Sequence, residues 1–180
     1  WMVLKETVVG EKIRAFDWRR ANPLGSVKQL GKLPGVRRFL LIYFLYHFAF
    51  TVYPSIWAYF GQESFDWTPA TIGLSLASFG LSMALVQGVL VGRLAGAIGE
   101  IGAALLGHFF ALATYLAIAL IGSGTVILVL TPLAALGGIL PITLQSVMSK
   151  RVSDDAQGEL QGALTSAMSL AMIVSPLTMP

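Results

Sequence analysis

Residues 39–60 read FLLIYFLYHFAFTVYPSIWAYF and contain no Asp, Glu, Lys or Arg. A bilayer core of about 30 Å needs roughly 20 predominantly apolar residues in a helix, so this stretch is long enough to cross a membrane. Four further apolar stretches follow at residues 69–91, 101–121, 125–147 and 158–180. Because unpaired backbone groups are costly in lipid, such spans form helices. The sequence therefore predicts an all-α, polytopic membrane helix bundle over residues 39–180.

The basic residues lie between these spans. Nine of the twelve Lys and Arg residues precede residue 39, and the other three are Arg93, Lys150 and Arg151. Cytoplasmic loops carry an excess of Lys and Arg, so we expect all three groups on the cytoplasmic side of a membrane, most simply the inner membrane of a bacterium. The intervening loop with Glu63 and Asp66 then lies outside, surrounded by aromatic residues that suit the headgroup region.

Composition excludes several classes of protein. Hydrophobic residues make up 56% of the chain, charged residues only 12%, and the mean hydropathy is +0.75, far from the composition of a soluble domain. Basic residues clustered beside apolar spans indicate membrane topology and anionic lipid, so we expect no nucleic-acid partner. The chain has no Cys, and its two His residues lack further ligands at metal spacing. We therefore expect no metal site and no cofactor.

Residues 1–38 are polar and basic, and we expect them to form a cytoplasmic segment. Within it, Asn22 can cap and Pro23 can open a short amphipathic helix with Leu24, Val27 and Leu30 on one face. The chain begins with Trp1 and stops inside an apolar segment. We therefore expect it to be part of a longer protein.

Polar residues inside the first span are the first candidates for a functional site. Tyr43, His47 and Thr51 recur at helical spacing, and His47 titrates near neutral pH. One hypothesis is a polar stripe that lines a substrate and proton pathway, since ionisable groups within a membrane tend to face cavities. The alternative is a histidine held by hydrogen bonds between packed helices. Gln145, on the fourth span, is a further candidate for the pathway.

Helix-breaking residues mark the fourth and fifth spans. Proline and glycine inside a membrane helix weaken or kink it, which suits a segment that bends during transport. Close helix packing is the alternative explanation for the same residues. The predicted structural hinge comprises Pro132, Gly137, Gly138, Pro141, Gln157, Gly158, Gln161 and Gly162.

The most specific pattern is Gly137-Gly138-Ile139, then Leu144-Gln145, then QGELQGAL at residues 157–164. It resembles the tetracycline-resistance type of drug exporter in the major facilitator superfamily. The resemblance continues through IGLSLA at residues 72–77 and through Leu94-Ala95 with Gly99-Glu100. It implies the C-terminal half of the major facilitator fold, with residues 1–38 as the central cytoplasmic loop and the spans as helices seven to about eleven of twelve. The N-terminal half of the same transporter would then be a partner.

The resemblance also implies a function. A relative of these exporters would be a secondary active transporter, not an enzyme, and would exchange a drug or small amphipathic compound for protons by alternating access. Arg93, Gly99 and Glu100 would belong to a gating loop on the cytoplasmic side. Two alternatives remain open: a carrier for an unrelated metabolite, and a membrane scaffold subunit that transports nothing.

Some positions depart from the exporter pattern. Ala111 stands where these exporters carry an acidic residue in the ninth helix, and Met83 stands where they carry a histidine in the eighth. His47 and Thr51 match two glutamines of the seventh helix. Since no acidic residue lies deep in any span, proton coupling would depend on His47 or on the other half.

Overall fold

The computed structural model describes residues 36–178, in which every regular element is helical. The amphipathic helix expected near Asn22 and Pro23 lies outside this range. Helix α2 covers Val36–Phe65, α3 covers Pro69–Leu85 and α4 covers Val91–Leu120. They are followed by α5 (Gly124–Ala134), α6 (Ile139–Ser149) and α7 (Gln157–Leu177). Three short irregular helices complete the order, namely η2 (Val86–Leu90), η3 (Ala135–Gly138) and η4 (Asp154–Ala156).

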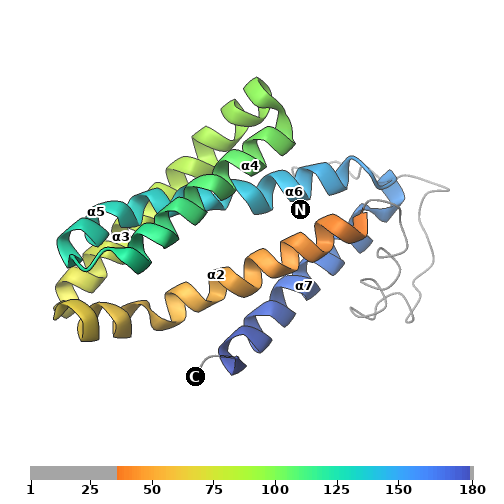
Figure 1. The fold of residues 1–180 in the computed structure, drawn as a ribbon. Coiled ribbons are helices and arrows are strands. Elements are labelled where there is room, and N and C mark those ends of the chain that lie inside the picture. Colours follow the sequence, from red (N-terminus) through yellow and green to blue (C-terminus); the bar gives the residue numbers. More distant parts are fainter. Residues whose placement is uncertain (1–35, 179–180) are drawn as a thin grey trace, which may run out of the picture.

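The helices are long and apolar enough to cross a membrane, which confirms the predicted polytopic bundle. Four continuous helical stretches meet this criterion: Val36–Phe65, Pro69–Leu120, Gly124–Ser149 and Gln157–Leu177. The second has 52 residues, more than twice what one crossing needs. It contains two crossings that form a hairpin (Figure 1). The first crossing comprises α3, η2 and the start of α4, and the second comprises the rest of α4.

The hairpin differs in one respect from the sequence-based expectation. A loop was expected between residues 91 and 101, but helical geometry continues through this region and is interrupted at Gly99, where φ is 76° and ψ is 163°. Only glycine adopts this combination without strain. A single residue therefore reverses the chain where a longer loop was expected.

The interior of two spans is irregular. The π-helix η2 joins α3 to α4, and the 3-10 helix η3 joins α5 to α6. These two segments contact each other. Single turns of this kind often occur at functional sites, and η3 coincides with Gly137 and Gly138 of the predicted hinge.

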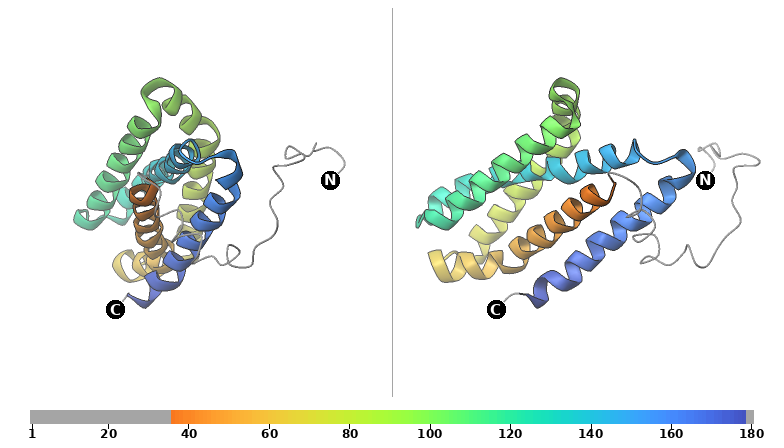
Figure 2. Two further views of the ribbon diagram at one scale, coloured as in Figure 1. Left: turned by 90° about the vertical axis from the view of Figure 1, so that its right-hand side faces the viewer. Right: turned by 45° about the vertical axis from the view of Figure 1, so that its right-hand side comes forward.

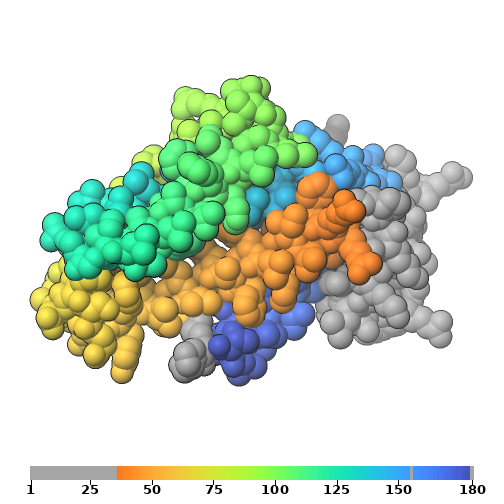
Figure 3. Space-filling model, in the orientation of Figure 1, coloured from red at the N-terminus to blue at the C-terminus, as the bar shows by residue number. Residues whose placement is uncertain are grey.

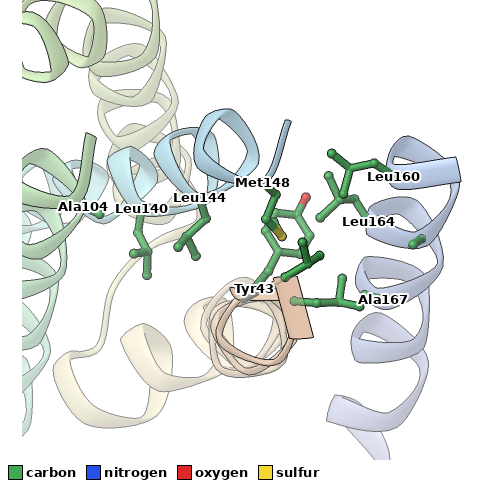
Figure 4. Packing of buried hydrophobic residues seen from close by; sticks show 11 residues of the cluster. Tyr43, Ala104, Leu140, Leu144, Met148, Leu160, Leu164 and Ala167 are labelled. Atoms are coloured by element: carbon green, nitrogen blue, oxygen red, sulfur yellow. The ribbon is translucent and has the colours of Figure 1, made fainter. Parts of the chain in front are cut away.

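Helices pair mainly in two layers. α2 lies alongside α7, and α4 lies alongside α6, as the views in Figures 1 and 2 show. The main core cluster lies between α2, α6 and α7 and includes Tyr43, Leu144, Met148, Leu160 and Leu164 (Figure 4). Because many large apolar side chains outside this cluster remain exposed, among them Leu41, Tyr59 and Leu81, the described surface suits lipid or further helices better than water.

The two ends of the bundle differ in chemistry. We call one the basic end, where Arg37 and Arg38 at the start of α2 lie near Lys150 and Arg151 at the end of α6. The other is the aromatic end, where Trp57, Trp67 and Ile127 form a buried cluster. There the Nε1 of Trp57 donates a hydrogen bond of 2.8 Å to the Oγ of Ser75. This bond joins α2 to α3 and satisfies two buried polar groups.

Candidate functional site

The predicted stripe on α2 is brought together only in part. Tyr43 is 8% exposed and belongs to the core between α2, α6 and α7. Its ring lies against the imidazole of His47, with centroids 4.5 Å apart. The Oγ1 of Thr51 donates a hydrogen bond of 2.7 Å to the backbone oxygen of His47 in its own helix. Thus Tyr43 packs in the core, and the hydroxyl of Thr51 is bonded within its own helix. Of the three residues, His47 is the one whose side chain still has a polar atom without a partner.

The imidazole of His47 is partly enclosed by aromatic rings. Tyr43 covers one side, and Tyr46 makes an edge contact with a centroid distance of 5.3 Å. The Nε2 atom of His47 is buried and has no hydrogen-bond partner within the described part of the chain. A buried polar nitrogen without a partner is costly. Like the hydroxyl of Tyr53, the other buried polar atom of α2 without a partner, this nitrogen is therefore a position where a water or a group from outside residues 36–178 would bind favourably.

A cavity of the described region lies beside the predicted stripe. It has a volume of about 390 Å³ and is bounded by α2, α4 and the η3–α6 segment. None of Tyr43, His47 and Thr51 lines it. Instead, the next face of α2 contributes, together with α4 residues that include Ala111. The lining residues are Ile42, Leu45, Tyr46, Ala49, Phe50, His108, Ala111, Leu112, Tyr115, Gly137 and Leu140.

Sequence reasoning missed this cavity. Ile42, Leu45 and Ala49 recur at helical spacing, but apolar residues at that spacing look the same whether they face lipid, another helix or a cavity. The polar residues of the lining, Tyr46, His108 and Tyr115, lie on two different helices and share no spacing along the sequence. Only the separation of α2 from α4 in three dimensions identifies the space.

Gln145 and the residues that begin α7 form a connected corner. The Nε2 of Gln145 donates to the Oε1 of Gln161 at 2.9 Å. The Nε2 of Gln157 donates to the backbone oxygen of Ser149 at 2.9 Å, and the Oγ of Ser149 donates back to the Oε1 of Gln157 at 2.9 Å. These bonds hold the end of α6 to the start of α7. A Cβ atom added at Gly158 or Gly162 would meet no atom within 4 Å, so the surface beside this corner is open.

The glycines in η3 are closely packed. A Cβ atom at Gly137 would lie 2.9 Å from the Cβ of Ala111 on α4, and one at Gly138 would collide with the Sδ of Met83 on α3. Pro132 lies inside α5, and Pro141 lies in the first turn of α6, where proline is tolerated. Close packing thus accounts for both glycines. Bending at these residues stays a prediction.

At the basic end, Glu100 pairs with α6. Its Oε1 accepts a hydrogen bond from the Nζ of Lys150 at 2.8 Å and another from the Oγ of Ser146. Arg93, the other charged residue of the expected gating loop, is exposed. Ser146 and Lys150 are four residues apart, so both side chains can reach Glu100 from the same side of α6.

A second basic side chain is also held at this end. The guanidinium of Arg151 lies over the ring of Phe39, 4.5 Å from its centroid. This cation–π contact joins the start of α2 to the end of α6. The basic end therefore has two connections to α6, one from α4 and one from α2.

These features together define an integral membrane protein built as a polytopic helix bundle, with polar connections at one end and a partly enclosed imidazole within a span. Residues 2–176 match the model of the Major Facilitator Superfamily, and the chain belongs to this family. The expected resemblance to tetracycline-resistance exporters is also confirmed by the relatives described next.

Several curated relatives are similar over most of the chain. A class C tetracycline resistance protein from Escherichia coli is 33% identical over 175 residues, which cover 97% of this chain and 44% of the relative. A class G protein from Vibrio anguillarum is 32% identical over 158 residues, covering 88% and 40%. A class E protein from Escherichia coli is 36% identical over 138 residues, covering 77% and 34%. The chain thus spans less than half the length of these relatives. No solved structure matches it.

Proposed function

We propose that these residues belong to a secondary active transporter of the bacterial inner membrane that exports a drug or another small amphipathic compound. The observation that carries this proposal is the similarity to tetracycline resistance proteins across 97% of the chain. The fold is compatible with it, since α3 and α4 form one membrane hairpin and the paired helices form layers that can move as units. Residues 1–38 would join this half to the other, on the cytoplasmic side.

We further propose that export is coupled to proton entry and that His47 takes part. A coupling group must alternate between a protonated and a neutral state while its surroundings change. The buried, unpartnered Nε2 of His47 supports this role. The contact of its ring with Tyr43, which packs against α7, would transmit a change of charge to the α2–α7 pair.

A gating role was expected for Arg93, Gly99 and Glu100, and the contacts of Glu100 indicate which residues would carry it. We propose that Glu100, Ser146 and Lys150 act as a latch between the α3–α4 hairpin and α6. Lys150 has 70% of its side chain exposed and Glu100 has 21%. Exposed ion pairs stabilise by roughly 0–1 kcal/mol. Such a contact can therefore open and close during each transport cycle.

Transport measurements on the full-length protein test the proposal. Inverted vesicles carrying the protein would be energised with a proton gradient and supplied with tetracycline, other amphipathic drugs and a panel of metabolites. We expect proton-driven accumulation of at least one drug, and at least a tenfold loss of drug–proton exchange in His47→Ala. Thr51→Val is the matched control because, among residues 36–178, the Thr51 hydroxyl bonds to the backbone of its own helix, and it should keep exchange within about twofold.

Each contrary result has a defined meaning. Flux of a metabolite without flux of any drug would replace the exporter with a carrier for that metabolite. Absence of all flux from correctly inserted protein would favour a scaffold subunit. Unchanged exchange in His47→Ala would remove His47 from the proton pathway while leaving export intact.

A further inference from the structure

A buried hydrogen bond joins α7 to the backbone of α2 beside His47. Ser175, on α7, is 0% exposed. Its Oγ donates to the backbone oxygen of Phe48 on α2 at 2.8 Å. Phe48 directly follows His47 in the chain, so the bond reaches the main chain next to the imidazole. In Figure 3, α7, in dark blue, lies directly against α2, in orange.

The direction of this bond is unusual for a hydroxyl on a helix. Serine and threonine often donate to the backbone oxygen four residues earlier in their own helix. Ser166 of α7 does so, with a bond of 2.7 Å to Gly162, and so does Thr51 of α2. The hydroxyl of Ser175 contacts a different helix instead. Inside a membrane bundle such a bond links two helices where lipid offers no other partner, so it fixes how α7 lies along α2.

The backbone of α2 is weakened around His47. The Oγ1 of Thr51 donates to the oxygen of His47, and the Oγ of Ser55 donates to the oxygen of Thr51, both at 2.7 Å. Pro54 lies inside α2 and has no N–H, so the carbonyl four residues earlier lacks its usual helical donor. Both features weaken or bend a helix. A bond from a second helix therefore matters more for holding this part of α2 in place.

We propose that Ser175 is a positioning residue for His47. This role rests on the proposed function in one respect, that the imidazole takes part in proton coupling. The Ser175 hydroxyl holds the main chain of α2 against α7, and the ring of Tyr43, which packs in the core between α2, α6 and α7, lies against the imidazole. Without the hydroxyl, this part of α2 can move away from α7. The buried Nε2 of His47 then meets different surroundings.

The other ionisable groups around the imidazole are few within residues 36–178. On α2, the rings of Tyr43 and Tyr46 contact it. Across the neighbouring cavity, α4 contributes His108 and Tyr115. Helices α3, α5 and α6, and α7 beyond its first turn, contain no ionisable residue. A signal from the imidazole itself is therefore needed to separate His47 from these four residues.

Two measurements on the full-length protein test the role of Ser175. The first is the ¹⁵N NMR signal of His47 in histidine-labelled protein in lipid vesicles, assigned by its absence in His47→Ala. The second is the pH dependence of tetracycline–proton exchange in inverted vesicles, with tetracycline counterflow, which needs no net proton movement, as the reference. Ser175→Ala removes the donor. Ser166→Ala is the matched control, because it removes a hydroxyl of the same helix that bonds to its own backbone.

We expect Ser175→Ala to move the ¹⁵N signal of His47 and to shift the midpoint of exchange by about 0.5 pH unit or more, with counterflow within about twofold of the parent. Ser166→Ala should change none of the three. Lower counterflow at an unchanged midpoint would indicate a purely structural bond and would overturn the proposal.

The signal of His47 also separates this proposal from the proposed function. An unchanged signal in Ser175→Ala overturns the positioning role, whatever the exchange rate is. A moved signal together with normal exchange in His47→Ala leaves the positioning of the imidazole standing and removes His47 from the proton pathway. If Ser175→Ala does not insert, Ser175→Cys decides, because a thiol occupies similar space but donates only weakly.

Discussion

At the scale of single residues, a side chain's surroundings separate positions that look equivalent in sequence. Tyr43, His47 and Thr51 occupy one helical stripe, yet burial, ring contact and local hydrogen bonding distinguish them. The glycines of the helices likewise differ in how closely other atoms surround them. Gly107 and Gly137 lie where α4 crosses η3, whereas Gly96 has no neighbouring atom within 4 Å of an added Cβ.

Gly107→Ala should destabilise the protein by about 1–3 kcal/mol, the usual range for overpacking. The added Cβ would lie 2.8 Å from the backbone oxygen of Leu136 and 2.8 Å from the Cβ of Ile139, and backbone cannot move aside cheaply. Gly102→Ala is the control, because its Cβ would come no closer than 3.4 Å to Ile98. Thermal unfolding of the full-length protein in detergent checks both. Equal melting temperatures for the two variants would contradict the close crossing.

At the scale of elements, the hairpin of α3 and α4 depends on one conformation. The backbone at Gly99 has φ 76° and ψ 163°, in a region that other residues occupy only under strain. Composition alone indicated two spans separated by a loop. The structure replaces most of that loop with helix and concentrates the reversal in one residue.

Gly99→Ala should therefore cost about 1–3 kcal/mol of stability through backbone strain. No atom lies within 4 Å of the added Cβ, so the effect would not arise from a clash. Gly96→Ala is the matched control. An added Cβ at Gly96 also meets no atom within 4 Å, but the backbone there is helical. Alanine at this position should be neutral or stabilise the protein by up to about 1 kcal/mol. The measurement is thermal unfolding. A Gly99→Ala variant as stable as Gly96→Ala would show that the reversal tolerates a side chain.

At the scale of the whole molecule, separate helices are joined at the basic end by contacts distant in sequence. Glu100 meets Ser146 and Lys150, and Arg151 meets Phe39. These contacts hold α2, α4 and α6 together where gating residues were expected. In each contact the basic side chain, Lys150 or Arg151, is exposed, which keeps the contact weak enough to break.

A double-mutant cycle on Glu100→Gln and Lys150→Met should give a coupling free energy of about 0.2–1 kcal/mol, because the pair is exposed and screened by salt. Unfolding midpoints of the two single variants and the double variant supply the cycle. Exchange of the charges in Glu100→Lys with Lys150→Glu should restore part of the loss, and 1 M salt should reduce the coupling. Additive single effects would mean that the two charges do not interact in the folded protein.

The sequence by itself determined that the chain lies in a membrane, where its apolar spans fall, and which family it resembles. These properties depend on composition along the chain: insertion free energy adds up residue by residue, and unpaired backbone in lipid forces helices. Tertiary structure alone decided which helix faces meet. It buried Tyr43, turned Thr51 to its own backbone, paired Glu100 with Lys150, and opened the cavity between α2 and α4, because contacts between distant helices depend on crossing geometry that helical periodicity does not encode.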